Sequence, residues 1–167
     1  MIGTLYSEVV AHTISGDVQL SADRLQVIEK ELVTLRAPSA LYNYVAIVRY
    51  FLESGTHSQN VLGDFVLLMQ PFLEEFAEAQ RGEGVFMFRA GTWLADLALA
   101  AAGEDELGLH QPFKLTYLQS NFTEIGAPQD VIESLNRLIE ITDNEMLSES
   151  DMAEAQDLIG RIRRQLM

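Results

Sequence analysis

The chain has 167 residues, of which 48% are apolar and 22% charged, a length and composition that suit one folded domain and exclude a largely disordered chain. Its 25 acidic and 11 basic side chains give a formal net charge of −14, which argues against binding to nucleic acid or to anionic membrane surfaces. The chain contains no cysteine, which excludes disulfides, thiolate metal sites, thiol nucleophiles and thioether-linked prosthetic groups.

The N-terminal segment has neither the basic region nor the apolar run of a secretory signal. Elsewhere the apolar stretches are interrupted before the roughly 18 residues that a membrane-spanning helix needs. We therefore expect a cytoplasmic protein without membrane insertion.

The first half of the chain shows the three- and four-residue apolar period of amphipathic helices. We expect Ser21 to be the N-cap of a helix that carries Leu25 to Leu35, and a break at residues 36–39, because Ala37 precedes a proline. A second apolar stripe covers residues 41–52 and stops at Ser54 and Gly55. The following stripe, residues 61–76, contains Pro71, which predicts a kinked helix or two helices that meet there.

The second half continues the same period. A helix is expected over residues 85–102, ended by Gly103, and a further helical segment over residues 115–125. Residues 126–128 predict a stop followed by a new start, with Pro128 in the first turn of the next helix. The last helix begins at Ser148, with Asp151 completing a short capping box. No segment alternates with a period of two and no period indicates a solenoid, so the fold class is all-α.

Chemistry-bearing residues are few. The histidines lack the spacing of zinc or di-iron ligands, and we interpret them as partly exposed side chains; they are His12, His57 and His110. A carboxylate cluster on the polar side of one stripe is interpreted as a solvated face; it consists of Glu74, Glu75 and Glu78. No nucleophile elbow, phosphate-binding loop or dinucleotide fingerprint is present, so we expect a protein that is not an enzyme and that holds no metal.

Three segments together resemble the phycobiliproteins, the helical light-harvesting subunits of cyanobacterial phycobilisomes. Residues 122–128 are similar to that family's aromatic-x-x-Leu-Gly-Thr-Pro turn, residues 147–155 to the opening of its final helix, and residues 20–25 to its Leu-Ser-x-x-Glu-Leu motif. The resemblance implies a globin-like, all-α helical bundle of the phycobiliprotein type, formed as a single domain by residues 1–167.

In that family an N-terminal helix protrudes and packs on a neighbouring subunit. The resemblance therefore implies that residues 1–16 act as a dimerisation segment, whose predicted interface residues are Leu5, Tyr6, Val9, Val10 and Ile14. The alternative for this short stripe is that it packs back on the chain's own core.

The family's bilin-attachment motif, Cys-Leu-Arg-Asp, falls on residues 87–90 of this chain. Met87 replaces the cysteine and cannot form a thioether, and Ala90 replaces the aspartate that would accept hydrogen bonds from the pyrrole nitrogens. Unpaired pyrrole N–H groups would each cost roughly 1–3 kcal/mol. A covalent bilin is chemically excluded, and tight non-covalent binding at the same place is disfavoured.

Arg89 matches the arginine of the motif and is either an anion clamp or, alternatively, a surface arginine or part of an internal salt bridge. Nearby aromatic residues form either core or a pocket; they are Phe86, Phe88 and Trp93. Phe86 and Phe88 lie two residues apart and hence on different sides of a helix, so we expect at least one to face a partner or a cavity.

The resemblance implies a bilin-free phycobiliprotein-like protein without a cofactor, acting through protein–protein contacts as an accessory or regulatory component of the phycobilisome. Its partner would be a second copy or a phycobiliprotein-type subunit, and its place the cytoplasm, at the cytoplasmic face of thylakoids through phycobilisomes. The alternative is a globin-like sensor or carrier that holds a haem or free tetrapyrrole near Arg89, Trp93 and His110.

Overall fold

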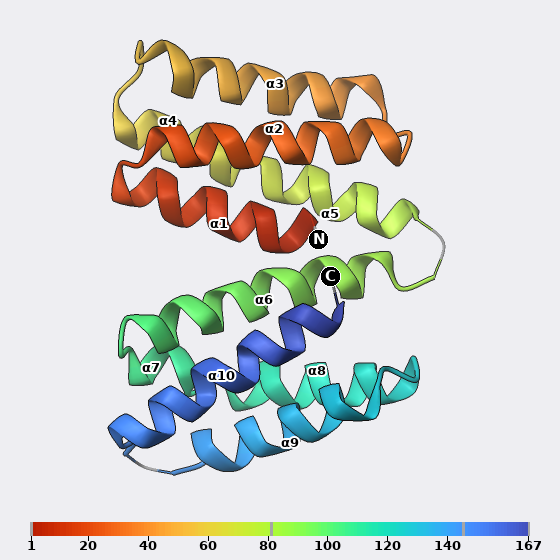
Figure 1. Ribbon diagram of the computed structural model, residues 1–167. Helices are drawn as coiled ribbons and strands as arrows, with labels where there is room; N and C mark the ends of the chain where they lie inside the picture. Colours follow the sequence, from red (N-terminus) through yellow and green to blue (C-terminus); the bar gives the residue numbers. More distant parts are fainter. Residues whose placement is uncertain (1, 81, 145, 167) are drawn as a thin grey trace. The chain divides into compact units, whose positions relative to one another are not determined.

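The computed structural model describes residues 2–80, 82–144 and 146–166, and these residues form helices joined by short loops, without any strand. The all-α expectation is confirmed. The chain groups into two compact units, Met1–Thr92 (unit 1) and Trp93–Met167 (unit 2), each described here by itself. The prediction of one domain over residues 1–167 stays a prediction. Figure 1 shows the order of the helices.

In unit 1, helix α2 lies between α1 and α3, and α4 packs against both α1 and α3 (Figure 1). The helices of this unit are α1 (Ile2–Ser15), α2 (Val18–Thr34), α3 (Ser39–Ser54), α4 (Gln59–Leu67), α5 (Met69–Ala79) and the first part of α6 (Gly84–Ala102). The apolar stripes of α2 and α3 face inward, so that Leu25, Ile28 and Val45 are fully buried. Gly55 ends α3 with a positive φ of 60°, as the sequence predicts.

The start of α2 differs from the expectation. Its N-cap is Asp17, whose side chain accepts a hydrogen bond from the Leu20 N–H at 3.2 Å. Ser21, the predicted cap, lies inside the helix, fully buried, with its hydroxyl 3.0 Å from that of Thr13. The reason is Gly16, which ends α1 at a φ of 84° and lets the next helix start at once on Asp17.

The stripe over residues 61–76 forms two helices, as one of the two alternatives predicts. The break falls at Leu68, between α4 and α5, so that Pro71 lies in the first turn of α5. A proline is tolerated there because the N–H groups of a first turn have no intrahelical partner.

The chain ends of unit 1 meet at a close crossing of α1 and α6. The Thr4 hydroxyl donates to the Gly91 carbonyl and the Thr92 hydroxyl to the Gly3 carbonyl, each at 3.3 Å. A Cβ added at Gly3 would lie 1.9 Å from the carbonyl oxygen of Phe88. Glycine is therefore required for this approach of two backbones.

In unit 2, α9 packs against both α8 and α10. Besides the second part of α6, it contains α7 (Glu106–Leu109), α8 (Pro112–Glu124), α9 (Gln129–Thr142) and α10 (Glu149–Leu166). The predicted capping box of α10 is confirmed, with the Asp151 N–H donating to the Ser148 hydroxyl at 3.2 Å and the Ser148 N–H to the Asp151 carboxylate at 2.9 Å. Pro128 is the N-cap of α9, at ψ 140°, rather than a member of its first turn.

The two units share a plan that the sequence analysis did not detect. At an interval of 90 residues, Arg36 and Gly126 occupy the same turn, with φ 58° and φ 70°. The next residue's N–H donates at 2.9 Å to the carbonyl five residues back in both turns, and Pro38 and Pro128 then cap the next helix with nearly the same dihedral angles. Buried core positions correspond at the same interval, as in the pairs Leu25 and Leu115, Ile28 and Leu118, Leu32 and Phe122, Val45 and Leu135, Val48 and Leu138.

Helix α6 is long and apolar enough, by length and composition alone, to cross a membrane, with a mean hydropathy of 1.3 over its best window. This differs from the expectation that no stretch reaches that length. Of that window, 44% is buried inside the protein, and the core helix of a soluble protein passes the same test.

Candidate functional site

The predicted dimerisation segment forms α1, which packs into unit 1 instead of protruding. Tyr6 and Val9 are buried in the core, with 2% and 0% of their surface exposed, and the Tyr6 ring lies 6.1 Å from that of Phe88. Leu5 and Val10 are half-buried against the same core. Helix α1 contacts α2 and α4, so the alternative, packing back on the chain's own core, describes it. Of the five predicted interface residues, only Ile14 is largely exposed.

Two of the four residues at the position of the bilin-attachment motif line a small cavity. Met87 and Phe88 line a space of about 140 Å³, below the roughly 300–1,000 Å³ of ordinary small-molecule sites. Ala90 is buried, and the Arg89 guanidinium pairs with the Glu74 carboxylate at 3.4 Å. The salt-bridge alternative for Arg89 is confirmed.

The aromatic pair next to this motif is buried on both sides of α6. Phe86 and Phe88 expose 6% and 5% of their surface. Phe88 lines the small cavity, so the expectation that one of the two faces a cavity is confirmed for Phe88. Both side chains belong to the interior rather than to an open surface.

The other two residues of the tetrapyrrole alternative belong to unit 2, whereas Arg89 belongs to unit 1. Trp93 packs edge-on against the Tyr117 ring at 5.4 Å, and the Lys114 ammonium lies 5.9 Å from the centre of its ring. His110 is the C-cap of α7, where its backbone N–H donates to the Glu106 carbonyl. The Trp93 side chain is thus packed within unit 2, and His110 contributes its backbone N–H to the end of α7.

The histidines and acidic residues singled out in the sequence are dispersed. His12, His57 and His110 are all half-exposed, as expected, and His57 packs edge-on against the Phe51 ring at 4.6 Å. Glu75 and Glu78 are exposed, in agreement with a solvated face. Among the residues that the structure describes, no three histidine or carboxylate side chains gather closely enough to hold a metal ion.

Two of the three most exposed apolar side chains of unit 2, Phe113 and Leu107, lie on one short segment, which sequence reasoning missed; the third, Met146, lies elsewhere and exposes 82% of its surface. Phe113 exposes 91% of its surface, Leu107 81% and Tyr117 39%; we call these three residues the α7–α8 surface. Phe113 and Tyr117 are four residues apart on α8 and so share a face, while the Gln111 side chain donates to the Leu107 carbonyl at 3.3 Å and ties α7 to the start of α8. The sequence signal that could have indicated this surface is that Phe113 and Tyr117 fall outside the apolar stripe formed by residues 115, 118 and 122, which are buried.

The charges next to the α7–α8 surface are mainly negative. Three consecutive exposed carboxylates precede Leu107 in the chain, namely Glu104, Asp105 and Glu106. The single cation of α8, Lys114, is directed toward the Trp93 ring. An apolar centre beside carboxylates complements a partner with an apolar pocket and a basic rim.

No family model matches the chain, and neither a curated protein nor a solved structure matches it. The function is therefore argued from the chain's own residues and geometry.

Proposed function

We propose that this protein is a non-enzymatic binding protein that acts through protein–protein contact, with the α7–α8 surface as its contact. The observation that carries the proposal is Phe113, a large aromatic side chain with 91% of its surface exposed; Leu107, on the preceding helix, exposes 81%.

Exposure of this kind is unfavourable in the free protein and favourable in a complex. A buried aromatic side chain removes about 150–250 Å² from water, and aromatic residues are enriched among the few side chains that dominate binding energy. The rigid two-angle side chain of Phe113 loses little conformational entropy on binding. Tyr117 is held in place by the Trp93 ring, so the surface is partly preorganised.

The acidic run before Leu107 selects the chemistry of the partner. Carboxylates at Glu104 to Glu106, together with the net charge of −14, repel an acidic surface and attract a basic one. The partner fitted by this surface is a protein with an apolar pocket flanked by lysine or arginine.

The resemblance of three segments to phycobiliproteins supports a narrower proposal. The protein is then a bilin-free, globin-like accessory or regulatory component of the phycobilisome in the cytoplasm, bound to a second copy or to a phycobiliprotein-type subunit. Met87 and Ala90 in place of the attachment cysteine and the aspartate support its pigment-free character.

The test compares two exposed apolar positions. Phe113→Ser removes the centre of the α7–α8 surface, and Leu67→Ser changes a side chain of unit 1 that is 52% exposed. Light scattering after gel filtration measures self-association, and capture from extracts of the native host measures binding to other proteins. We expect Phe113→Ser to abolish the complex and Leu67→Ser to preserve it, with unchanged circular dichroism for both.

A complex that survives Phe113→Ser would show that the contact lies elsewhere, and a wild-type protein that stays monomeric and captures nothing would refute the proposal. Deletion of residues 1–16 is unsuitable as a test, because it would remove Tyr6 and Val9 from the core of unit 1.

A further inference from the structure

Unit 1 contains a half-open apolar groove between α3 and α5. Its volume is about 570 Å³, within the range of sites that hold small molecules. Tyr44 and Phe72 lie across it with their ring centres 5.7 Å apart, and the Tyr44 hydroxyl donates to the Phe65 carbonyl at 3.1 Å. The remaining lining is mainly apolar and consists of Pro38, Ala40, Leu41, Phe76 and Ala79, with Arg36, Glu75 and Gln80 as its polar members.

Arg36 lies in this lining with its backbone in an unfavourable conformation. Its φ is 58°, a left-handed value that favours glycine, and the corresponding turn of unit 2 uses Gly126 at φ 70°. Among the described residues, the Arg36 guanidinium makes no ion pair or side-chain hydrogen bond, and the side chain is exposed. An unpaired cation therefore stands where glycine would relieve strain, and strain retained at one position is typical of binding sites.

Unit 2 has a groove at the corresponding place, and its lining is charged. The apolar lining of the unit 1 groove is therefore not a consequence of the arrangement that the two units share. Ala40, Tyr44 and Glu75 of unit 1 correspond at 90 residues to Asp130, Ser134 and Gln165, which line a groove of about 570 Å³ between α9 and α10.

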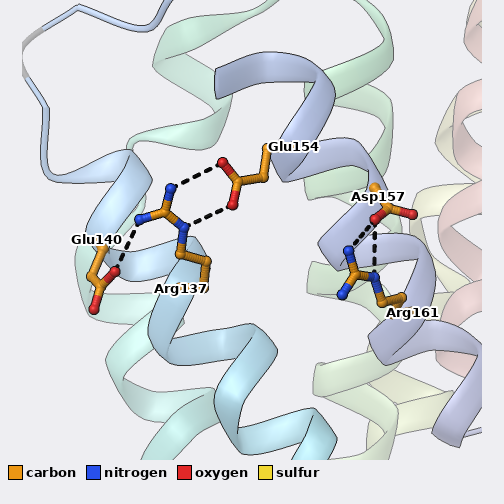
Figure 2. Close-up of polar contacts among 5 residues, drawn as sticks. All are labelled: Arg137, Glu140, Glu154, Asp157 and Arg161. Carbon is orange, nitrogen blue, oxygen red and sulfur yellow. Dashed lines mark hydrogen bonds and ion pairs between the residues drawn. The ribbon is translucent and has the colours of Figure 1, made fainter. Parts of the chain in front are cut away.

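That second groove is crossed by ion pairs. Arg137 binds Glu154 at 2.7 Å and Glu140 at 3.1 Å, and Arg161 pairs with Asp157 along α10 (Figure 2). Two of its three arginines, Arg137 and Arg161, are thus paired with neighbouring carboxylates, whereas Arg164 in this groove and Arg36 in the other make no ion pair among the described residues.

From these observations we infer that the groove of unit 1 binds a free amphiphilic anion, a molecule with an apolar chain or ring and one carboxylate, whose head pairs with Arg36. The apolar body replaces water against Tyr44 and Phe72. The guanidinium supplies a charge-assisted, bidentate partner for the carboxylate. The ligand is a free molecule rather than part of an anionic membrane, because a net charge of −14 repels a surface of many negative charges far more strongly than it repels a single carboxylate.

Glu75 is the other charged group of the groove and opposes an anion. The two charges therefore give opposite expectations. If the ligand is an anion, removing the Arg36 charge weakens binding and removing the Glu75 charge strengthens it. A cationic occupant gives the reverse result.

The experiment is isothermal titration calorimetry of the full chain with dodecanoate, dodecan-1-ol and dodecyltrimethylammonium, each below its micelle concentration. We expect dodecanoate to bind most tightly. Arg36→Gly should lower the affinity for dodecanoate by about tenfold to a hundredfold while raising the Tm by about 2–4 °C, so that loss of binding cannot be attributed to unfolding. Glu75→Gln should raise that affinity, and Arg36→Lys should retain most of it.

Ala79→Trp, which fills the groove without altering Arg36, locates the site and should abolish binding of both dodecanoate and the alcohol. The inference is overturned if dodecanoate does not bind, if the alcohol or the cation binds more tightly, or if Arg36→Gly leaves the affinity for dodecanoate unchanged. Tighter binding of the cation would indicate a basic amphipathic peptide as occupant. These outcomes concern unit 1 and are independent of the contact proposed for Phe113 in unit 2.

Discussion

The crossing of α1 and α6 gives a quantitative prediction for Gly3→Ala. The new Cβ would lie 1.9 Å from the Phe88 carbonyl oxygen, whereas ordinary contact begins at 3.4 Å, so the helices must separate by the difference, about 1.5 Å. This breaks the two 3.3 Å hydrogen bonds of Thr4 and Thr92, at about 0.5–1.5 kcal/mol each. With about 1–3 kcal/mol for overpacking, the free energy of unfolding should fall by about 2–6 kcal/mol.

A second variant and a matched control complete this test. Gly91→Ala places a Cβ 2.9 Å from the Thr4 nitrogen, a milder overlap than that of Gly3→Ala, and should lower the stability less. Because Gly91 lies in the middle of α6, fraying of a helix end cannot relieve this overlap. Gly63→Ala, in α4, meets no atom within 4 Å and should stabilise the protein by about 0.5–1 kcal/mol.

Urea denaturation followed by circular dichroism measures all three variants. If Gly3→Ala and Gly63→Ala unfold within about 0.5 kcal/mol of each other, α1 does not pack on α6 as described, and a protruding helix becomes the better description.

Three further predictions concern unit 2 and the absence of pigment. Ser148→Ala should lower the stability by about 1 kcal/mol through loss of the capping box, whereas Ser150→Ala, an exposed neighbour, should have little effect in the same denaturation assay. Hydrogen bonds from Ser148 lower the pKa of Asp151, and a hydrogen bond from Arg137 lowers that of Glu154. The stabilisation by these two carboxylates is therefore complete above their ordinary pKa values of 3.8 and 4.5, and it is lost as the pH falls through the lowered pKa values. Thermal melts across acid pH measure this loss. We expect the Tm of Arg137→Gln to fall less with decreasing pH than the Tm of the wild type. Protein purified from its native host should show neither a Soret band nor a bilin band, and either band would contradict the pigment-free proposal.

Local signals predicted most of the helix boundaries because their causes are local. Gly55 and Gly126 end helices through positive φ, and Ser148 with Asp151 starts one, each within a few residues of sequence. The prediction of Ser21 as a cap was wrong for a cause that is also local. Asp17 and Ser21 are both capping residues near the start of α2, and Gly16, directly before Asp17, selects Asp17.

The surfaces could not be predicted because their causes are distant in sequence. The stripe of α1 suits a dimer interface as well as a core, and the choice depends on α2, α4 and Phe88, some of which lie far along the chain. The exposure of Phe113 likewise depends on which face of α8 is covered. The shared plan of the units escaped detection because many corresponding positions agree in burial but differ in residue type, as Leu32 and Phe122 show.

Helix α6 has a consequence for synthesis of the chain. Its first part belongs to unit 1 through Gly91 and Thr92, so unit 1 is complete only when the ribosome has released residue 92. From Trp93 the same helix continues into unit 2, where elongation adds one hydrogen bond per residue and needs no new nucleus. We therefore expect the part of α6 in unit 2 to form by elongation from the part in unit 1.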